Sequence, residues 1–135
     1  NPHAFWKPIL KTPPDRDALQ HAALGMNGLS VIFDRLMLGT DSAPHPVSKK
    51  ECDCGCAGVF NATIALKVLA PYFVKYSTFE SFQPFTNGNA RRIYGINPPI
   101  KKVTLVKRQN VVPRLYATDV VPMMAGQTLE WDIAA

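Results

Sequence analysis

Residues 39–45 read Gly-Thr-Asp-Ser-Ala-Pro-His, and they follow directly on a short apolar run, Leu-Met-Leu. A nearly continuous apolar run that stops at a glycine is typical of a fully buried parallel strand, so we expect a strand over residues 35–40. Upstream, Pro-Pro-Asp at residues 13–15 predicts the start of a helix, which Gly25 or Gly28 should end. A helix followed by a buried strand indicates an α/β unit.

Asp41 stands at the point where this predicted strand ends. In parallel α/β barrels the loops at the carboxyl ends of the strands converge on one mouth, so a carboxylate there is a candidate base or metal ligand. From position alone, however, a loop aspartate is more often a turn former. The polar stretch 41–58 is too long and too rich in Pro, Lys and Cys for regular structure, which favours a functional loop.

Two helices are predicted after this loop. The spacing of apolar residues indicates a helix over residues 61–76, with a kink at Pro71. Residues 77–80, Ser-Thr-Phe-Glu, fit a capping box, so a second helix should start near Thr78 and end at residues 87–88.

The remainder of the chain changes from helical to β-branched character. Asn89 is expected to cap a short helix that Gly95 closes. Beyond the proline pair at residues 98–99, the apolar residues predict a few short strands with turns at Asn110 and Gly126.

The composition limits the class of protein. The chain has 135 residues, of which 47% are hydrophobic and 19% charged, a balance typical of a folded domain. Fifteen Lys and Arg against ten Asp and Glu leave a net charge of +5, which favours an anionic substrate but falls short of a dedicated nucleic-acid binder. No apolar run approaches the roughly 20 residues that span a bilayer, and we expect a cytoplasmic protein without membrane or nucleic-acid partners. A start at Asn1 without Met leads us to expect a piece of a longer protein.

Several stretches together resemble one enzyme family. Residues 39–45, with Lys50 further on, resemble the second signature of dihydroorotases, the zinc amidohydrolases of pyrimidine biosynthesis. Residues 50–62 are similar to the loop and helix start of the single-function bacterial type. Residues 3–11 resemble the segment that ends an earlier barrel strand, and residues 121–128 resemble the final strand pair. The resemblance covers almost the whole chain in the order of the family.

The resemblance implies an α/β fold class: the C-terminal part of a TIM-like (β/α) barrel of the metallo-dependent amidohydrolase type, with a C-terminal helical and β extension. On this basis residues 1–95 would hold the last barrel strands, the active-site loop and the helices, and residues 96–135 the β extension. A whole barrel takes roughly 250 residues, so this chain would hold only the last strand or two.

The resemblance also implies roles for particular residues. Asp41 would be a ligand of one of two zinc ions and the general base and acid in the reversible conversion of dihydroorotate to N-carbamoyl-L-aspartate. His45 and the backbone amide of Ala57 would bind the substrate carboxylate, and main-chain groups of Lys7 would hold the edge of the pyrimidine ring. Without the resemblance, His45 would be read as a solvent-facing histidine between two prolines.

The chain lacks much of what this family needs. It contains three histidines and no His-x-His pair, and the resemblance identifies no carbamylated lysine. One carboxylate cannot hold two zinc ions, so we expect activity only together with the N-terminal part of the same enzyme. The family further implies a homodimer for the intact protein.

Two other readings remain open. The chain could be a non-catalytic homologous module that binds a partner. Alternatively, Cys52, Cys54 and Cys56 could form a structural zinc clip in a small zinc-binding or nucleic-acid-binding domain. Their Cys-x-Cys spacing is unusual for zinc and no second Cys pair exists, so reduced thiols in the loop that presents Ala57 are the favoured interpretation. The other basic residues are expected to form a solvated face.

Overall fold

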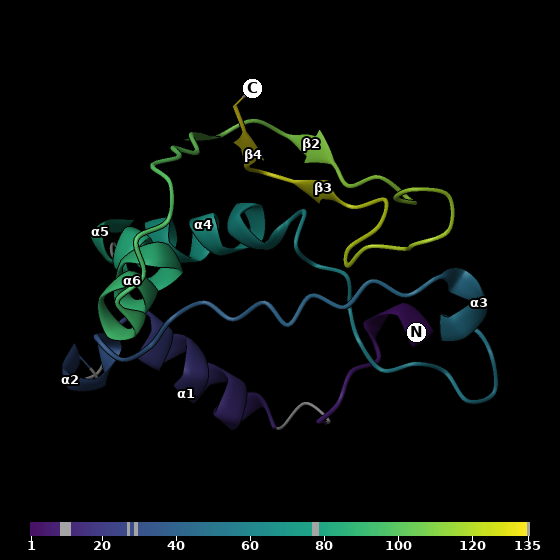
Figure 1. The fold of residues 1–135 in the computed structure, drawn as a ribbon, viewed down its shortest axis with the longest axis horizontal. Coiled ribbons are helices and arrows are strands. Elements are labelled where there is room, and N and C mark those ends of the chain that lie inside the picture. Colours follow the sequence, from purple (N-terminus) through teal and green to yellow (C-terminus); the bar gives the residue numbers. More distant parts are fainter. Residues whose placement is uncertain (9–11, 27, 29, 77–78, 135) are drawn as a thin grey trace. The chain divides into compact units, whose positions relative to one another are not determined.

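The computed structural model describes residues 1–8, 12–26, 28, 30–76 and 79–134. The chain forms two compact units (Figure 1). One is assembled from residues 1–10, 40–68 and 105–135, and the other from residues 11–39 and 69–104. Each unit therefore combines segments that are far apart in the sequence. The predicted division at residues 95 and 96 stays a prediction.

The second unit is helical. Its elements are α1 (Pro13–Ala23), α2 (Ser30–Phe33), the second half of α4 (Ala65–Lys75), α5 (Phe79–Gln83), a π-helical turn (Pro84–Gly88) and α6 (Asn89–Tyr94). The prediction for α1 is confirmed: Asp15 accepts hydrogen bonds from the Thr12 amide at 3.0 Å and the Thr12 hydroxyl at 2.7 Å, and Gly25 has a φ of 68° after the last turn. The predicted capping box at residues 77–80 begins outside the described residues.

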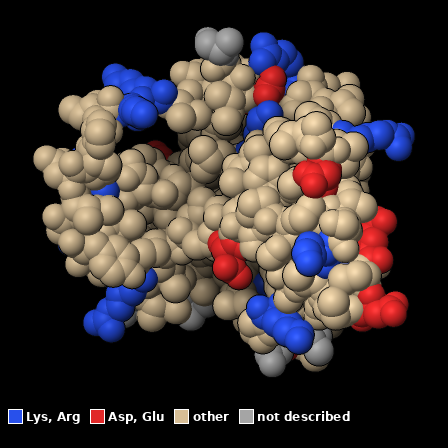
Figure 2. Space-filling model, turned by 45° about the vertical axis from the view of Figure 1, so that its right-hand side comes forward, with Lys and Arg blue, Asp and Glu red and all other residues tan. Residues whose placement is uncertain are grey.

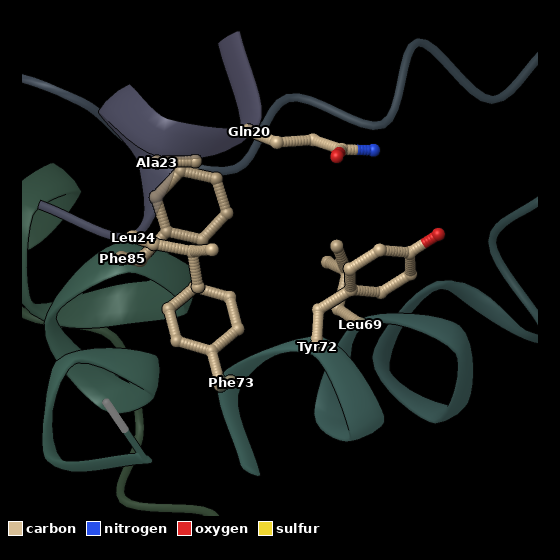
Figure 3. Close-up of a pocket in the computed structure, with 7 residues that line it drawn as sticks. All are labelled: Gln20, Ala23, Leu24, Leu69, Tyr72, Phe73 and Phe85. Atoms are coloured by element: carbon tan, nitrogen blue, oxygen red, sulfur yellow. The ribbon is translucent and has the colours of Figure 1, made fainter. Parts of the chain in front are cut away.

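Aromatic side chains form the core of the helical unit. The Phe73 ring lies edge-on to Phe82, with 5.1 Å between the ring centroids, and 5.6 Å from Phe85. Beside them is an apolar cavity of about 180 Å³, into which side chains of α1 and α4 point (Figure 3). Its lining residues are Gln20, Ala23, Leu24, Leu69, Tyr72, Phe73 and Phe85.

Asn89 has a role different from the predicted one. It is 4% exposed and its side-chain amide donates to the carbonyls of Phe33, at 2.9 Å, and Leu36, at 2.7 Å. Its backbone is already helical at the start of α6, which continues directly from the π-helical turn. The prediction of a helix cap was therefore wrong, because two carbonyls distant in sequence occupy the amide. Gly95 closes α6 with a φ of 62°, as predicted.

The first unit contains the strands, in two antiparallel pairs. β1 (Leu105–Val106) pairs with β4 (Asp132–Ile133), and β2 (Asn110–Val111) pairs with β3 (Thr128–Leu129) (Figure 1). The unit also holds a 3-10 helix (Pro2–Ala4), the one-turn helix α3 (Val47–Lys50) and the start of α4. Its core cluster consists of Ile64, Val112 and Leu129, with Val68, Met123 and Met124 packed against it.

Two of the predicted β features differ in the structure. Residues 35–40 are irregular and half-buried or exposed, so the predicted buried strand was wrong. A strand needs a neighbour for its backbone groups, and here the Leu38 amide donates to the carbonyl of Phe85, in the π-helical turn. The turn predicted at Asn110 was wrong, because Asn110 lies in β2 and pairs with Leu129. Its side chain donates to the Trp131 carbonyl at 2.6 Å. The turn at Gly126, with a φ of 76°, is confirmed.

Asp132 on β4 lies between two cations of the first unit. Its Oδ1 is 2.8 Å from Lys67 Nζ and its Oδ2 is 2.5 Å from Arg108 Nη2. Hydrogen bonds from Lys67, and then from Arg108, hold the pKa of this carboxyl well below its ordinary value of 3.8. Because the folded pKa lies below the unfolded one, the carboxylate stabilises the fold at neutral pH. That stabilisation is lost as the pH falls below about 4 toward the folded pKa.

We predict that Asp132→Asn lowers the free energy of unfolding at neutral pH and makes it less dependent on pH below about pH 4. Urea unfolding at a series of pH values measures both effects. The matched control is Asp53→Asn, which neutralises an exposed carboxylate of the same unit. An equal change in the two variants would show that net charge, and not the ion pairs, is responsible.

No helix among the described residues is both long and apolar enough to cross a membrane.

Candidate functional site

Asp41 adopts an unusual backbone conformation at the start of the polar loop. Its φ is 44°, in the left-handed region that aspartate and asparagine tolerate better than most residues. The side chain is exposed, and its carboxylate has no hydrogen-bond partner among the residues that the structure describes. Asp41 is therefore not the turn-capping residue that its position alone favours, and its carboxylate is available to a ligand.

Ser42 and Asn61 hold the backbone on either side of Asp41. Ser42 Oγ accepts hydrogen bonds from the amides of Asn61, at 3.2 Å, and Ala62, at 3.0 Å. The Asn61 side-chain amide donates to the Thr40 carbonyl at 2.8 Å, and Asn61 is 9% exposed. These bonds join the Asp41 segment to the residues that precede α4, so the position of Asp41 depends on residues about 20 further along the chain.

His45 lies against the backbone of Gly58. A Cβ built on Gly58 would be 3.0 Å from His45 Nε2 and 2.7 Å from the Cβ of Ala43, closer than side chains pack. Gly58 has a φ of 132°, which side chains rarely adopt. Because Ala57 precedes Gly58, the structure brings His45 next to the backbone that carries Ala57.

Lys50 is the centre of this arrangement. It is 4% exposed, and its Nζ donates to the carbonyls of Cys56 and Gly58, both at 2.7 Å, and to that of Phe5 at 3.2 Å. The Gly58 amide also donates to the Phe5 carbonyl at 3.0 Å. One buried cation thus joins the N-terminal segment to the loop on both sides of Ala57. Lysine is almost never fully buried unless it is paired, and here three carbonyl dipoles surround it.

The N-terminal segment brings Lys7 to the same unit. Lys7 is exposed and follows Phe5 by two residues, with its Nζ 5.8 Å from the centroid of the Phe5 ring. His3 Nε2 lies 2.8 Å from Glu51 Oε1, directly after α3. These contacts place the start of the chain against the loop that contains Lys50. All four predicted site residues, Lys7, Asp41, His45 and Ala57, lie in the first unit.

Four residues that shape the site had no role assigned from the sequence: Ser42, Lys50, Gly58 and Asn61. All lie in the stretches that carry the resemblance, but sequence spacing does not show which carbonyl a lysine reaches. The one available signal was Lys50 itself, because the resemblance includes a lysine at this place without a chemical role.

Gly58 offers a direct test of the packing around His45. We predict that Gly58→Ala lowers the free energy of unfolding by about 2 kcal/mol, because the new methyl group meets Ala43 and His45 at a strained φ. Urea unfolding measures this change. Gly39→Ala is the matched control, since a Cβ at Gly39 meets no atom within 4 Å. Equal stability of the two variants would contradict the close packing.

The described residues supply only part of the ligands that a zinc ion needs. Asp41 offers one free carboxylate, which fits a single oxygen ligand of zinc. No group of three or more His, Cys, Asp and Glu side chains suited to a metal occurs in the described part of the chain. Any zinc centre with three or more protein ligands that uses Asp41 must therefore take at least one of them from outside the described residues.

Comparison with known proteins gives relatives but no family model. No protein-family model matches the chain. The chain is 39% identical to the dihydroorotase of Yersinia enterocolitica over 137 residues, which cover 99% of this chain and 38% of that protein. The mitochondrial dihydroorotase of Arabidopsis thaliana is 38% identical over 133 residues, covering 96% of this chain and 34% of that protein.

Two solved structures resemble the chain over nearly its whole length. The dihydroorotase of Campylobacter jejuni matches 100% of this chain with a TM-score of 0.82 and 37% identity, and the match covers 38% of that chain. The dihydroorotase of Saccharomyces cerevisiae, in complex with 5-fluoroorotic acid, matches 99% of this chain and 38% of its own, with a TM-score of 0.83 and 28% identity. The expected fold class is thus confirmed, because the chain has the mixed helix and strand structure of part of a dihydroorotase. The chain spans about 38% of the length of the Yersinia enterocolitica relative.

Proposed function

We propose that this homologue of the dihydroorotases is the C-terminal part of such an enzyme, and that the whole protein interconverts dihydroorotate and N-carbamoyl-L-aspartate in pyrimidine biosynthesis. The observation that carries the proposal is the free Asp41 carboxylate in the same unit as His45, Ala57 and Lys7, in a chain similar to dihydroorotases over nearly all its residues. The predicted division into residues 1–95 and a β extension at 96–135 is part of this proposal.

Asp41 is the proposed proton carrier. In ring opening, a water molecule attacks the ring carbonyl, and Asp41 accepts its proton and passes it to the departing ring nitrogen. In ring closure the same carboxylate works in reverse, so one group serves both directions. Its position at the surface of this chain and its lack of a competing hydrogen bond support this role. Zinc, when bound, lowers the pKa of the attacking water and polarises the carbonyl, and Asp41 would supply one of its ligands.

His45, Ala57 and Lys7 are the proposed substrate-binding residues. His45 and the Ala57 amide would hold the carboxylate of the substrate, and backbone groups of Lys7 would hold the ring edge. The close approach of His45 to Gly58 supports a shared role for His45 and the adjacent Ala57. Lys50 supports it further, because its cationic Nζ orients the carbonyls on both sides of Ala57. The net charge of +5 suits an anionic substrate.

The whole enzyme is required for this chemistry. The remaining zinc ligands and the other carboxylate-binding groups would come from the N-terminal part of the same enzyme. As implied by the family, we propose a zinc-dependent homodimer in the cytoplasm, without a nucleic-acid or membrane partner.

The test is an assay of dihydroorotate hydrolysis on two samples whose intact masses are first determined. The whole protein that carries this chain, loaded with zinc, should turn over dihydroorotate, whereas this 135-residue chain alone should not. A folded, zinc-loaded whole protein without turnover in either direction would favour the non-catalytic, partner-binding module. Turnover by the chain alone would contradict the requirement for the N-terminal part.

The small zinc-binding or nucleic-acid-binding domain finds little support. The described residues contain no metal-binding group of three, although Cys52 and Cys54 are neighbours. On the face in Figure 2, Lys and Arg side chains lie in separate small groups.

A further inference from the structure

Two exposed thiols lie in direct contact in the loop after α3. The Sγ atoms of Cys52 and Cys54 are 3.2 Å apart, and both side chains are exposed. Neither has a part in the proposed hydrolysis. The third cysteine, Cys56, is half-buried. The loop therefore presents one pair of thiols at the surface.

Backbone hydrogen bonds hold this pair in place. The Gly55 amide donates to the Cys52 carbonyl at 2.9 Å, which closes a tight turn around Asp53 and Cys54. The Cys52 thiol lies 3.5 Å from the carbonyl of Lys49, which also accepts from the Cys56 amide at 2.9 Å. The turn is thus anchored to α3 on both sides, and these hydrogen bonds place the two thiols side by side.

The contact makes the two thiols chemically unequal. The hydrogen bond from the Cys54 thiol lowers the pKa of Cys52, and the same hydrogen bond raises the pKa of Cys54. A thiolate is the reactive form of cysteine toward oxidants, and a neighbouring thiol can resolve its oxidised product. Cys52 is therefore suited to be the attacking residue and Cys54 the resolving residue.

We propose that Cys52 and Cys54 form a reversible redox pair that a hydroperoxide oxidises to a disulfide within the loop. The Cys52 thiolate attacks the peroxide O–O bond and becomes a sulfenic acid, and the peroxide leaves as hydroxide, which a proton converts to water. The Cys54 sulfur then attacks the Cys52 sulfur, the S–O bond breaks, and a second water leaves with the Cys54 proton. Two thiols and one hydrogen peroxide thus give one disulfide and two waters.

The geometry requires little movement for this bond. A disulfide has an S–S length of about 2.05 Å, so the two sulfurs need to approach each other by roughly 1.2 Å. The turn is exposed and contains one residue between the cysteines, and strained or exposed disulfides are the ones that thiols reduce readily. The pair is therefore expected to open again with an added dithiol. This proposal does not depend on the hydrolase activity.

The experiment treats the folded whole protein with a small excess of hydrogen peroxide, alkylates the remaining thiols in denaturant and measures the tryptic peptide of residues 51–67. This peptide carries all three cysteines of the chain. The wild type should contain one alkylated cysteine and lack two hydrogen atoms, and dithiothreitol before alkylation should restore three alkylated cysteines. The matched variants are Cys56→Ser, which should still form the disulfide, and Cys52→Ser and Cys54→Ser, which should keep two alkylated cysteines.

The same measurement can overturn the proposal. Disulfide formation in Cys52→Ser but not in Cys56→Ser would assign the bond to Cys54 and Cys56. Three alkylated cysteines in the oxidised wild type, or sulfinic acid without a disulfide, would show that the pair does not resolve. Each serine replaces an exposed or half-buried thiol of similar size, and circular dichroism of each variant checks whether it is folded.

Discussion

Asp41→Asn should lower the rate of dihydroorotate hydrolysis by the whole protein by about 10³-fold, because the amide can neither accept the proton of water nor return it to the ring nitrogen. The free energy of unfolding should change by less than about 0.5 kcal/mol, since the Asp41 side chain is exposed. Asparagine is preferable to alanine here because it also tolerates the φ of 44°. Steady-state kinetics in both directions and urea unfolding measure the two effects.

The matched control for this variant is Asp53→Asn. Asp53 is an exposed aspartate of the same loop, and no role in hydrolysis is proposed for it. We expect nearly unchanged kinetics. If Asp41→Asn retained most of the activity while its zinc content was normal, the assignment of the proton carrier to Asp41 would be wrong, although the chain could still contribute to substrate binding.

Lys50→Met should lower the free energy of unfolding by about 3 kcal/mol. The methionine side chain fills a similar volume but leaves the carbonyls of Phe5, Cys56 and Gly58 without their charged donor. The effect should be strongest in the loop, so the amide of Gly58, which donates to Phe5, should exchange with deuterium much faster. Hydrogen–deuterium exchange and urea unfolding on the whole protein measure the local and the overall effect.

Lys49→Met provides the control, because Lys49 is the exposed neighbour of Lys50 on α3. It removes the same charge and adds the same side chain without breaking a bond to the loop. We expect a change of less than about 0.5 kcal/mol. In the whole enzyme, Lys50→Met should also raise the KM for dihydroorotate, because the backbone around Ala57 loses its support. Similar loop protection in the two variants would contradict the central position of Lys50.

The sequence by itself determined those helices and turns that depend on residues within a few positions of one another. The proline pair and Asp15 predicted α1, the apolar spacing after residue 61 predicted the helix that forms as α4, and Gly126 predicted a turn. The stretch at residues 39–45 also identified the relatives. These features depend on neighbouring residues, because helix caps, apolar periodicity and positive φ at glycine act within a few positions of the chain.

Only the tertiary structure decided where polar groups find partners far along the chain. The residues around Asn89 predict that it caps a helix, but its side-chain amide donates to carbonyls more than 50 residues earlier in the chain. The apolar run at residues 35–40 predicts a strand, but these residues are irregular in the structure. The Leu38 amide donates to the Phe85 carbonyl. The sequence around Lys50 does not indicate a partner for its side chain, yet its Nζ donates to the carbonyl of Phe5, 45 residues earlier. A buried polar group must be paired, and which group pairs with it depends on the fold as a whole.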